Sequence, residues 1–104
     1  MSKEDLRSKR LDKTQARKLI SFIANKHPEN IVFSRHAQEE MKNDGLTVND
    51  VWNVIKGSAS RIVEEPELVS GTWRYRLKTE RIAVVVSFSS KTSAAIVTVW
   101  RIKP

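Results

Sequence analysis

The hydrophobic pattern changes its period a little past the middle of the chain, and this change most constrains the fold. Up to Gly57, apolar residues recur at helical spacing. Beyond it come four runs rich in β-branched and aromatic residues: SRIVEE, TWRYRLK, RIAVVVSF and AAIVTVWRI. Runs with such short links pair as antiparallel neighbours, because a parallel crossover needs about a dozen residues or more. The sequence therefore predicts an α+β fold, with about three N-terminal helices packed on one face of a four-stranded, mainly antiparallel sheet.

Three segments carry signals for the start and end of a helix. The first is LDKTQARKLISFIANKH, in which Asp12 can cap the start. The second runs roughly over residues 35–43, with Ser34 as its N-cap. The third is LTVNDVWNVIKG, in which Thr47 and Asp50 resemble a capping box. Together these segments supply the helical layer of the predicted fold.

Length and composition set the organisation of the chain. At 104 residues it has the size of one domain, which we place at residues 12–104, after a basic leader, residues 1–11, that we expect to be mobile. No apolar run is long enough to span a membrane, and the N-terminus has no apolar signal segment, so we expect a cytoplasmic protein with no membrane partner. With no cysteine and only two histidines, the chain is expected to use neither a metal nor a cofactor.

The net charge of +7 is unevenly distributed. Residues 1–18 and residues 71–104 each contain seven Lys or Arg, whereas the middle of the chain has more acidic than basic residues. Such a field favours a polyanionic partner, and RNA, DNA and an acidic protein are the alternatives. A solvated surface that is merely basic is the plainest interpretation.

The cations are concentrated in GTWRYRLKTERIAVVVSF, residues 71–88. A two-residue turn at Thr79 and Glu80 places Lys78 opposite Arg81 and gives this hairpin two unlike faces. The face predicted to join the core consists of Trp73, Tyr75, Leu77, Ile82, Val84, Val86 and Phe88. The other face consists of Arg74, Arg76, Lys78 and Arg81 around Ala83, Val85 and Ser87.

The last strand, AAIVTVWRI, is apolar on both of its sides, as in a central strand that is covered on both faces. If Arg101 shares a face with Arg74 and Arg76, the sheet presents a cationic groove large enough for a nucleic-acid backbone. If it does not, the arginines form a solvated strand face. The three tryptophans are expected in the core, and stacking on a base is the alternative for one of the two that lie in strands.

Two parts of the chain resemble known families. The segment FSRHAQEEM resembles the start of a widespread family of small prokaryotic domains of unknown function, and the segment VTVWR at residues 97–101 resembles its end. The later part is similar to MqsR-type toxins in Gly45-Leu46, Asn53-Val54-Ile55, Gly57, residues 75–78 and residues 84–88. Both families belong with the RelE-like toxins, and the resemblance covers roughly residues 31–104.

This resemblance implies a RelE-like fold and the activity of a toxin from a type II toxin-antitoxin system. Such a toxin is a metal-independent endoribonuclease, or mRNA interferase, that cleaves RNA by attack of the 2′-hydroxyl. The resemblance also implies RNA and a cognate antitoxin protein as partners, and the ribosome as a further one, because some RelE-like proteins act only on translated messages. A non-catalytic module that binds RNA, DNA or the antitoxin is the alternative.

The implied chemistry needs a base for the 2′-proton, an acid for the 5′-oxygen and fixed cations for the phosphoryl oxygens. The candidate catalytic residues are Arg74, Tyr75, Arg76, Lys78 and His36. The arginines are candidate phosphate clamps, because a guanidinium binds phosphate oxygens bidentately. Tyr75 and Lys78 match the MqsR-like strand and are candidates for proton transfer by resemblance, although the hairpin register turns Tyr75 towards the core. His36 is a candidate acid or base, because an imidazole exchanges its proton near neutral pH, and a structural role is the alternative.

Further contacts to RNA are expected from cations outside this hairpin face. They are Arg17, Lys18, Arg35, Arg81, Arg101 and Lys103. Arg101 is also a candidate phosphate clamp. His27 is expected to act as a favourable charge at the C-terminal end of the first helix.

Overall fold

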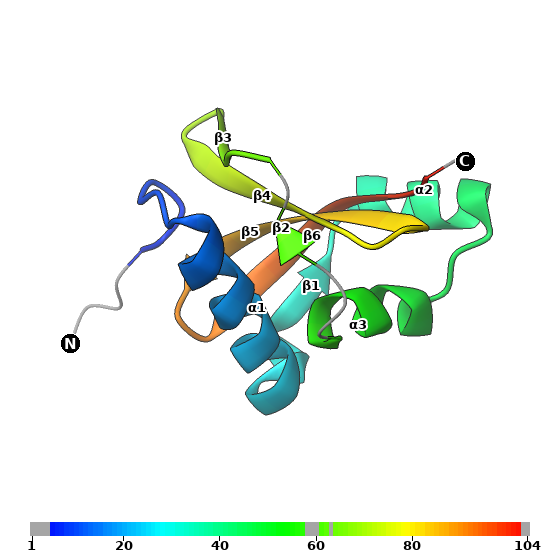
Figure 1. The fold of residues 1–104 in the computed structure, drawn as a ribbon, viewed down its shortest axis with the longest axis horizontal. Helices are drawn as coiled ribbons and strands as arrows, with labels where there is room; N and C mark the ends of the chain where they lie inside the picture. The colour runs from blue at the N-terminus through cyan, green and yellow to red at the C-terminus, as the bar shows by residue number, and fades with distance from the viewer. Residues whose placement is uncertain (1–4, 58–60, 63, 103–104) are drawn as a thin grey trace.

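The computed structural model describes residues 5–57, 61–62 and 64–102. Within these residues the chain forms three α-helices, one short 3₁₀ helix and six strands (Figure 1). The helices are α1 (Lys13–Lys26), α2 (Arg35–Asp44) and α3 (Val48–Lys56), and the 3₁₀ helix is Pro28–Asn30. The strands are β1 (Ile31–Phe33), β2 (Arg61–Ile62), β3 (Glu67–Val69), β4 (Thr72–Lys78), β5 (Ile82–Ser90) and β6 (Ser93–Arg101).

The sheet differs from the predicted one. Over the described residues it has six strands in the order β1-β6-β5-β4-β2, and β3 pairs with β4 beside this path. β1 runs parallel to β6, with Ile31 opposite Ala94, so the sheet is mixed. The predicted four-stranded, mainly antiparallel, RelE-like sheet is therefore wrong, although the α+β class and the three helices are observed. The two strands that the predicted sheet leaves out, β1 and β3, have only three residues each, which is too short for a periodic pattern.

The helices do not all lie on one face of the sheet. α1 and α3 lie side by side against one face, whereas α2 lies along β6 (Figure 1). The residues that α1 and α3 cover are buried: Tyr75, Leu77, Val84, Val86, Phe88, Ile96 and Val99. They pack with Ile20, Ile23, Val51 and Ile55 in one hydrophobic core. None of the helices in the described part of the chain is long and apolar enough to cross a membrane.

The predicted helix caps are confirmed. The Asp12 carboxylate accepts a hydrogen bond from the backbone N–H of Gln15 at 2.7 Å, and the Gln15 side chain accepts one from the Asp12 N–H at 3.1 Å. The Ser34 hydroxyl accepts a hydrogen bond from the N–H of Ala37 at 3.0 Å. Thr47 and Asp50 form a capping box at the start of α3. These contacts span three residues each, so the local sequence decides them.

The β4–β5 hairpin has a register that differs from the predicted one. Lys78 lies opposite Ala83 and not opposite Arg81, because the turn lies one residue later than predicted: the Thr79 N–H donates to the Ile82 carbonyl at 2.9 Å, which leaves Glu80 and Arg81 between the strands. This displacement is two residues. Side chains alternate between faces with a period of two, so the predicted core face and basic face are both retained. Arg81, however, lies in the turn and not on the basic face.

The N-terminal leader is attached to the sheet over the residues that the structure describes. The side chain of Leu6 is 3% exposed, and its N–H donates to the Ser89 carbonyl at 3.2 Å. The Arg7 carbonyl accepts a hydrogen bond from the Trp73 N–H at 2.8 Å. Leu11 is also buried. Two leucines and backbone hydrogen bonds therefore attach residues 5–11 to the rest of the domain, whereas residues 1–4 of the predicted leader lie outside the described part.

Candidate functional site

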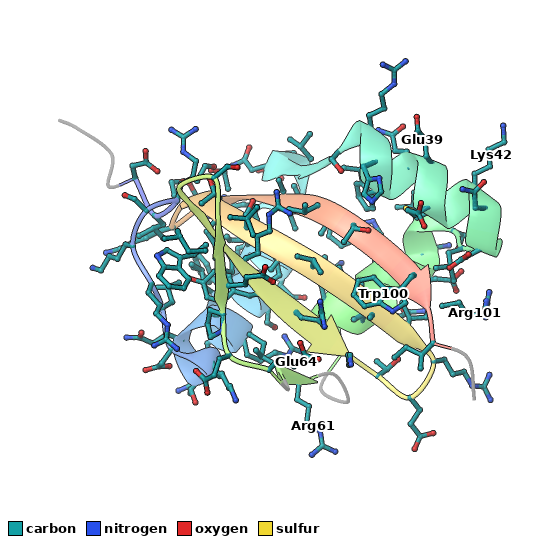
Figure 2. The ribbon with its side chains drawn as sticks, turned by 90° about the horizontal axis from the view of Figure 1, so that it is seen from above. Glu39, Lys42, Arg61, Glu64, Trp100 and Arg101 are labelled. Atoms are coloured by element: carbon teal, nitrogen blue, oxygen red, sulfur yellow. The ribbon has the colours of Figure 1, made fainter. Side chains whose placement is uncertain are left out.

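The face of the sheet opposite α1 and α3 carries the predicted arginines, and Figure 2 looks onto it. We call it the open face. Across β4, β5 and β6 it is built from two rows, one with Arg76, Val85 and Thr98 and one with Lys78, Ala83 and Trp100. A hollow of about 140 Å³ lies over this face. Its lining comprises Glu64, Glu65, Glu67, Val69, Arg74, Arg76, Val85, Thr98 and Trp100.

Arg76 is the centre of the polar contacts on the open face. Its Nη1 donates to Oε2 of Glu64 at 2.6 Å, and Nζ of Lys78 donates to Oε1 of the same carboxylate at 3.4 Å. The Cζ atom of Arg76 lies 5.1 Å from the centroid of the Trp100 ring, a distance typical of a cation–π contact. We call Glu64, Arg76 and Lys78 the Glu64 cluster. It brings two cations into contact with one carboxylate beside an aromatic ring.

The charges of the Glu64 cluster favour the ionised carboxylate. The hydrogen bond from Arg76 is the main cause that lowers the pKa of Glu64, and the hydrogen bond and charge of Lys78 act in the same direction. Glu64 is therefore ionised at neutral pH, the state in which a carboxylate can accept a proton. The guanidinium and ammonium groups can each bind an anionic oxygen. This combination can accept a proton, donate a proton and stabilise negative charge within one small area.

The open face is less basic than the sequence suggested. Besides Glu64, it carries Glu65, which pairs with Arg10 at 2.6 Å and with Lys13 at 3.1 Å. These two cations lower the pKa of Glu65. Glu67 lies opposite Arg74 in the β3–β4 pair. The acidic residues that precede β4 thus compensate part of its positive charge.

Arg101 does not lie on the open face. It pairs with Ile82, its N–H donates to Oδ2 of Asp44 at 2.8 Å, and its Nε donates to the Asp44 carbonyl at 3.3 Å. The cause is a register shift: Val86 pairs with Ile96 and Val85 with Thr98, so the pairing skips one residue of β6. This shift turns Trp100 onto the open face (Figure 2). The groove formed by Arg101 together with the β4 arginines is therefore absent from the described residues.

Tyr75 lies in the core and not on the open face. Its side chain is 1% exposed, and its ring packs against Phe88 with the centroids 5.4 Å apart. Its hydroxyl accepts a hydrogen bond from the Leu11 N–H at 2.9 Å and donates one to the Lys9 carbonyl at 3.4 Å. Burial raises the pKa of this hydroxyl. Tyr75 therefore anchors the leader from the predicted core face, and its catalytic role stays a prediction.

The motif FSRHAQEEM forms the start of α2. The Ser34 hydroxyl caps this helix and also donates to the Val97 carbonyl at 2.8 Å, so it ties α2 to β6. His36 is exposed in the first turn, and its side chain has no hydrogen bond to any described residue. Arg35 is also exposed and forms a loose pair with Glu39 at 3.9 Å. The structure therefore assigns a structural role to Ser34, and it does not bring His36 into the Glu64 cluster through any hydrogen bond.

The remaining predicted cations lie at several other places. The Arg17 guanidinium donates to two carbonyl oxygens at the C-terminal end of α3, that of Ile55 at 3.2 Å and that of Gly57. Lys18 is the exposed neighbour of Arg17 on α1. Arg81 lines a cleft of about 690 Å³ at the end of the sheet. Lys103 lies outside the described residues. Of the predicted site residues, the structure thus brings Arg74, Arg76 and Lys78 together on one face.

Sequence reasoning missed the two partners of Arg76. Glu64 follows β2, which pairs with β4 so that Arg61 lies opposite Lys78, and this pairing carries the acidic residues over the open face. The run EEPE before the basic strand was the available signal, but β2 has only two residues and its partner could not be read from it. Trp100 was missed because its face depends on the register shift in β6.

The comparisons with known proteins give one match. Neither a curated protein nor a solved structure shows significant similarity to the chain. A family model described as "Domain of unknown function (DUF4258)" matches residues 33–101. This description states no activity, so the resemblance to RelE-like toxins stays a prediction. Among the described residues no group of His, Cys, Asp and Glu is arranged to hold a metal ion. Since the family model matches more than half of the chain, the chain belongs to this family of domains of unknown function, DUF4258.

Proposed function

We propose that this protein is a metal-independent endoribonuclease whose active site is the Glu64 cluster. The observation that supports the proposal is the contact of one carboxylate with both a guanidinium and an ammonium group, at 2.6 Å and 3.4 Å. Cleavage of RNA by its own 2′-hydroxyl needs these three kinds of group and no other reactant.

In this proposal each residue of the cluster has one role. The Glu64 carboxylate accepts the proton of the 2′-hydroxyl, and the 2′-oxygen forms a bond to phosphorus. Arg76 stabilises the charge on the non-bridging phosphoryl oxygens, with Arg74 two residues away on the same face of β4 as a second cation. Lys78 donates a proton to the 5′-oxygen as its bond to phosphorus breaks. The products are a 2′,3′-cyclic phosphate and a 5′-hydroxyl.

The biological setting is part of the proposal. The resemblance to RelE-like toxins supports a toxin of a type II toxin-antitoxin system that acts in the cytoplasm, with RNA as substrate and an antitoxin as protein partner. The open face is the surface that an antitoxin would cover to prevent cleavage. The ribosome is a further partner if cleavage requires a translated message.

The test is incubation of the purified protein with long single-stranded RNA in EDTA, followed by analysis of the new ends. We expect 2′,3′-cyclic phosphate and 5′-hydroxyl ends. Glu64→Gln is expected to reduce the rate by about 10²–10⁴-fold, the usual contribution of a general base. Glu65→Gln is the matched control, because it removes the neighbouring carboxylate, which pairs with Arg10 and Lys13 and not with the cluster.

Two results would contradict the proposal. One is cleavage by Glu64→Gln at the rate of the unsubstituted protein. The other is intact RNA both with the isolated protein and in a reaction with translating ribosomes. If RNA remains intact but is bound with an affinity that falls with salt, the protein is a non-catalytic RNA-binding module.

A further inference from the structure

We infer that the helical side of the molecule carries a second binding site, a groove along α1 and the end of α3 that takes the phosphate backbone of single-stranded RNA. The groove encloses about 590 Å³. Its lining comprises Arg17, Lys18, Ser21, Phe22, Asn25, Lys26 and Lys56. The inference deepens the proposed function, since it takes RNA as the substrate class and adds where its backbone is held.

The groove and the open face lie on opposite sides of the sheet. α1 and α3 cover the face that bears the core (Figure 1), and Trp100 projects from the other face (Figure 2), where Cζ of Arg76 lies 5.1 Å from its ring centroid. An RNA that contacts both sites must therefore pass around the edge of the sheet. Long RNA can reach both sites, whereas an oligonucleotide of a few residues can reach only one.

The groove differs from the open face in its charge. All four of its charged lining residues are cations, and none is an acid. Lys18, Lys26 and Lys56 form no ion pair with any residue in the part of the chain that the structure describes. On the open face, by contrast, Glu64 occupies Arg76 and Lys78. Phosphates that bind in the groove displace only counterions, so the groove is the stronger electrostatic site.

Arg17 is not counted among these phosphate contacts. Its guanidinium donates to the Ile55 and Gly57 carbonyls, and burial lowers its pKa. It holds the end of α3 beside α1 and so shapes the wall of the groove. The three lysines supply the phosphate contacts.

Among the described residues, the one aromatic side chain that lines the groove, Phe22, favours single-stranded RNA over an acidic protein. Phe22 is 47% exposed, and its ring lies edge-on to His27 with the centroids 5.6 Å apart. Lys56 Nζ lies 5.2 Å from the centroid of the Trp52 ring. A basic groove that tracks a backbone beside an exposed aromatic ring is the arrangement on which unpaired bases stack.

The test measures binding without cleavage. A fluorescent single-stranded RNA of about 30 nucleotides, fully 2′-O-methylated so that it cannot be cleaved, is titrated with the full chain over a range of salt concentrations. The test variant carries Lys18→Gln, Lys26→Gln and Lys56→Gln. The control variant loses the same charge from three exposed lysines elsewhere, with Lys9→Gln, Lys42→Gln and Lys91→Gln.

We expect the slope of log affinity against log salt concentration to be shallower by about 2 in the test variant. Each phosphate contact on a single strand contributes about 0.7 to this slope, and the variant loses three lysines. Its affinity at about 0.1 M salt is expected to fall by on the order of 100-fold, and that of the control variant by about threefold or less. Phe22→Leu is expected to weaken binding by about 5-fold or more through the loss of base stacking.

Equal losses of RNA affinity in the test and control variants would overturn the inference. They would show that binding depends on the net charge of the protein and not on the position of the three lysines. An unchanged slope in the test variant would also overturn it, as would displacement of the RNA by polyglutamate of the same total charge. Cleavage is scored separately in the EDTA assay above. A protein that cleaves RNA but shows no change of slope refutes the groove alone, and one that shows the change without cleavage refutes the nuclease alone.

Discussion

The guanidinium of Arg76 lies over the indole ring of Trp100, with its Cζ 5.1 Å from the ring centroid. Glu64 holds the same guanidinium from another direction, at 2.6 Å. Two independent contacts therefore fix a side chain that is otherwise among the most flexible. A cation that is oriented before the substrate binds stabilises developing charge without reorganisation, which is the property that a phosphate clamp requires.

Trp100→Leu is expected to slow RNA cleavage, because Arg76 loses the ring that orients it. A cation–π contact contributes about 0.5–2 kcal/mol, so the expected decrease in kcat is about 2- to 30-fold. Trp100→Phe keeps an aromatic face and should retain most of the activity. Single-turnover cleavage of the two variants measures the difference, and equal rates for both would show that the ring does not position Arg76.

The pH dependence of cleavage follows from the charge state of Glu64. Its ordinary pKa is 4.5, and the hydrogen bond from Arg76 lowers it in the folded protein. The carboxylate is therefore still ionised at pH 4.5 and gains its proton only at lower pH, so the acidic limb of the rate profile is expected below pH 4.5. Arg76→Gln removes the main cause of the lowered pKa and should move that limb to higher pH. A limb near pH 6 to 7 in the unsubstituted protein would contradict Glu64 as the base.

The sequence predicts those parts of the fold that depend on near neighbours. The caps at Asp12, Ser34 and Thr47 were predicted because each involves contacts over three residues. The two faces of β4 and β5 were predicted because alternation survives a displacement of two residues.

The features that the sequence does not reveal depend on partners that are far apart in the chain. β1 pairs with β6 although Ile31 and Ala94 lie far apart in the sequence. Glu64 reaches Arg76 only because β2 pairs with β4. The face of Trp100 follows from one skipped residue in the β5–β6 pairing, and no local pattern marks that position.

Tyr75→Phe separates the structural role of this residue from the catalytic role suggested by resemblance. The variant keeps the ring against Phe88 but leaves the buried Leu11 N–H without its acceptor, so the free energy of unfolding is expected to fall by about 1–3 kcal/mol. Cleavage at a temperature where both proteins are folded should be unchanged. Urea denaturation and the EDTA assay measure the two quantities. A large loss of cleavage with unchanged stability would return Tyr75 to the catalytic groups.

Ser34→Ala and His36→Ala test the two polar residues of the α2 motif against each other. Ser34→Ala removes the N-cap and the hydrogen bond to the Val97 carbonyl, so we expect a loss of stability of about 1–2 kcal/mol. His36 is exposed and has no hydrogen bond from its side chain to a described residue, so His36→Ala should leave the midpoint of thermal unfolding nearly unchanged. The rate of cleavage by His36→Ala then reports on chemistry alone. A decrease of about 10²-fold or more would place this imidazole among the proton-transfer groups.

Arg17 and Lys18 are adjacent cations on α1, and the structure predicts opposite consequences for their removal. Arg17→Ala deprives the Ile55 and Gly57 carbonyls at the end of α3 of a charged donor, so we expect a loss of stability of about 1.5–3 kcal/mol. Lys18→Ala removes an exposed side chain with no ion pair to a described residue, and it should leave stability within about 0.5 kcal/mol.

In RNA binding we expect Lys18→Ala to have the larger effect. It should reduce the slope of log affinity against log salt concentration by about 0.7, because it removes one phosphate contact. Arg17→Ala, measured under conditions where it is folded, should reduce this slope by less. Urea denaturation and salt titration of the same two proteins measure stability and this slope. The opposite result would be full stability of Arg17→Ala together with a larger decrease in the salt-dependence slope than that of Lys18→Ala. In that case the Arg17 guanidinium binds RNA, and other contacts stabilise the end of α3.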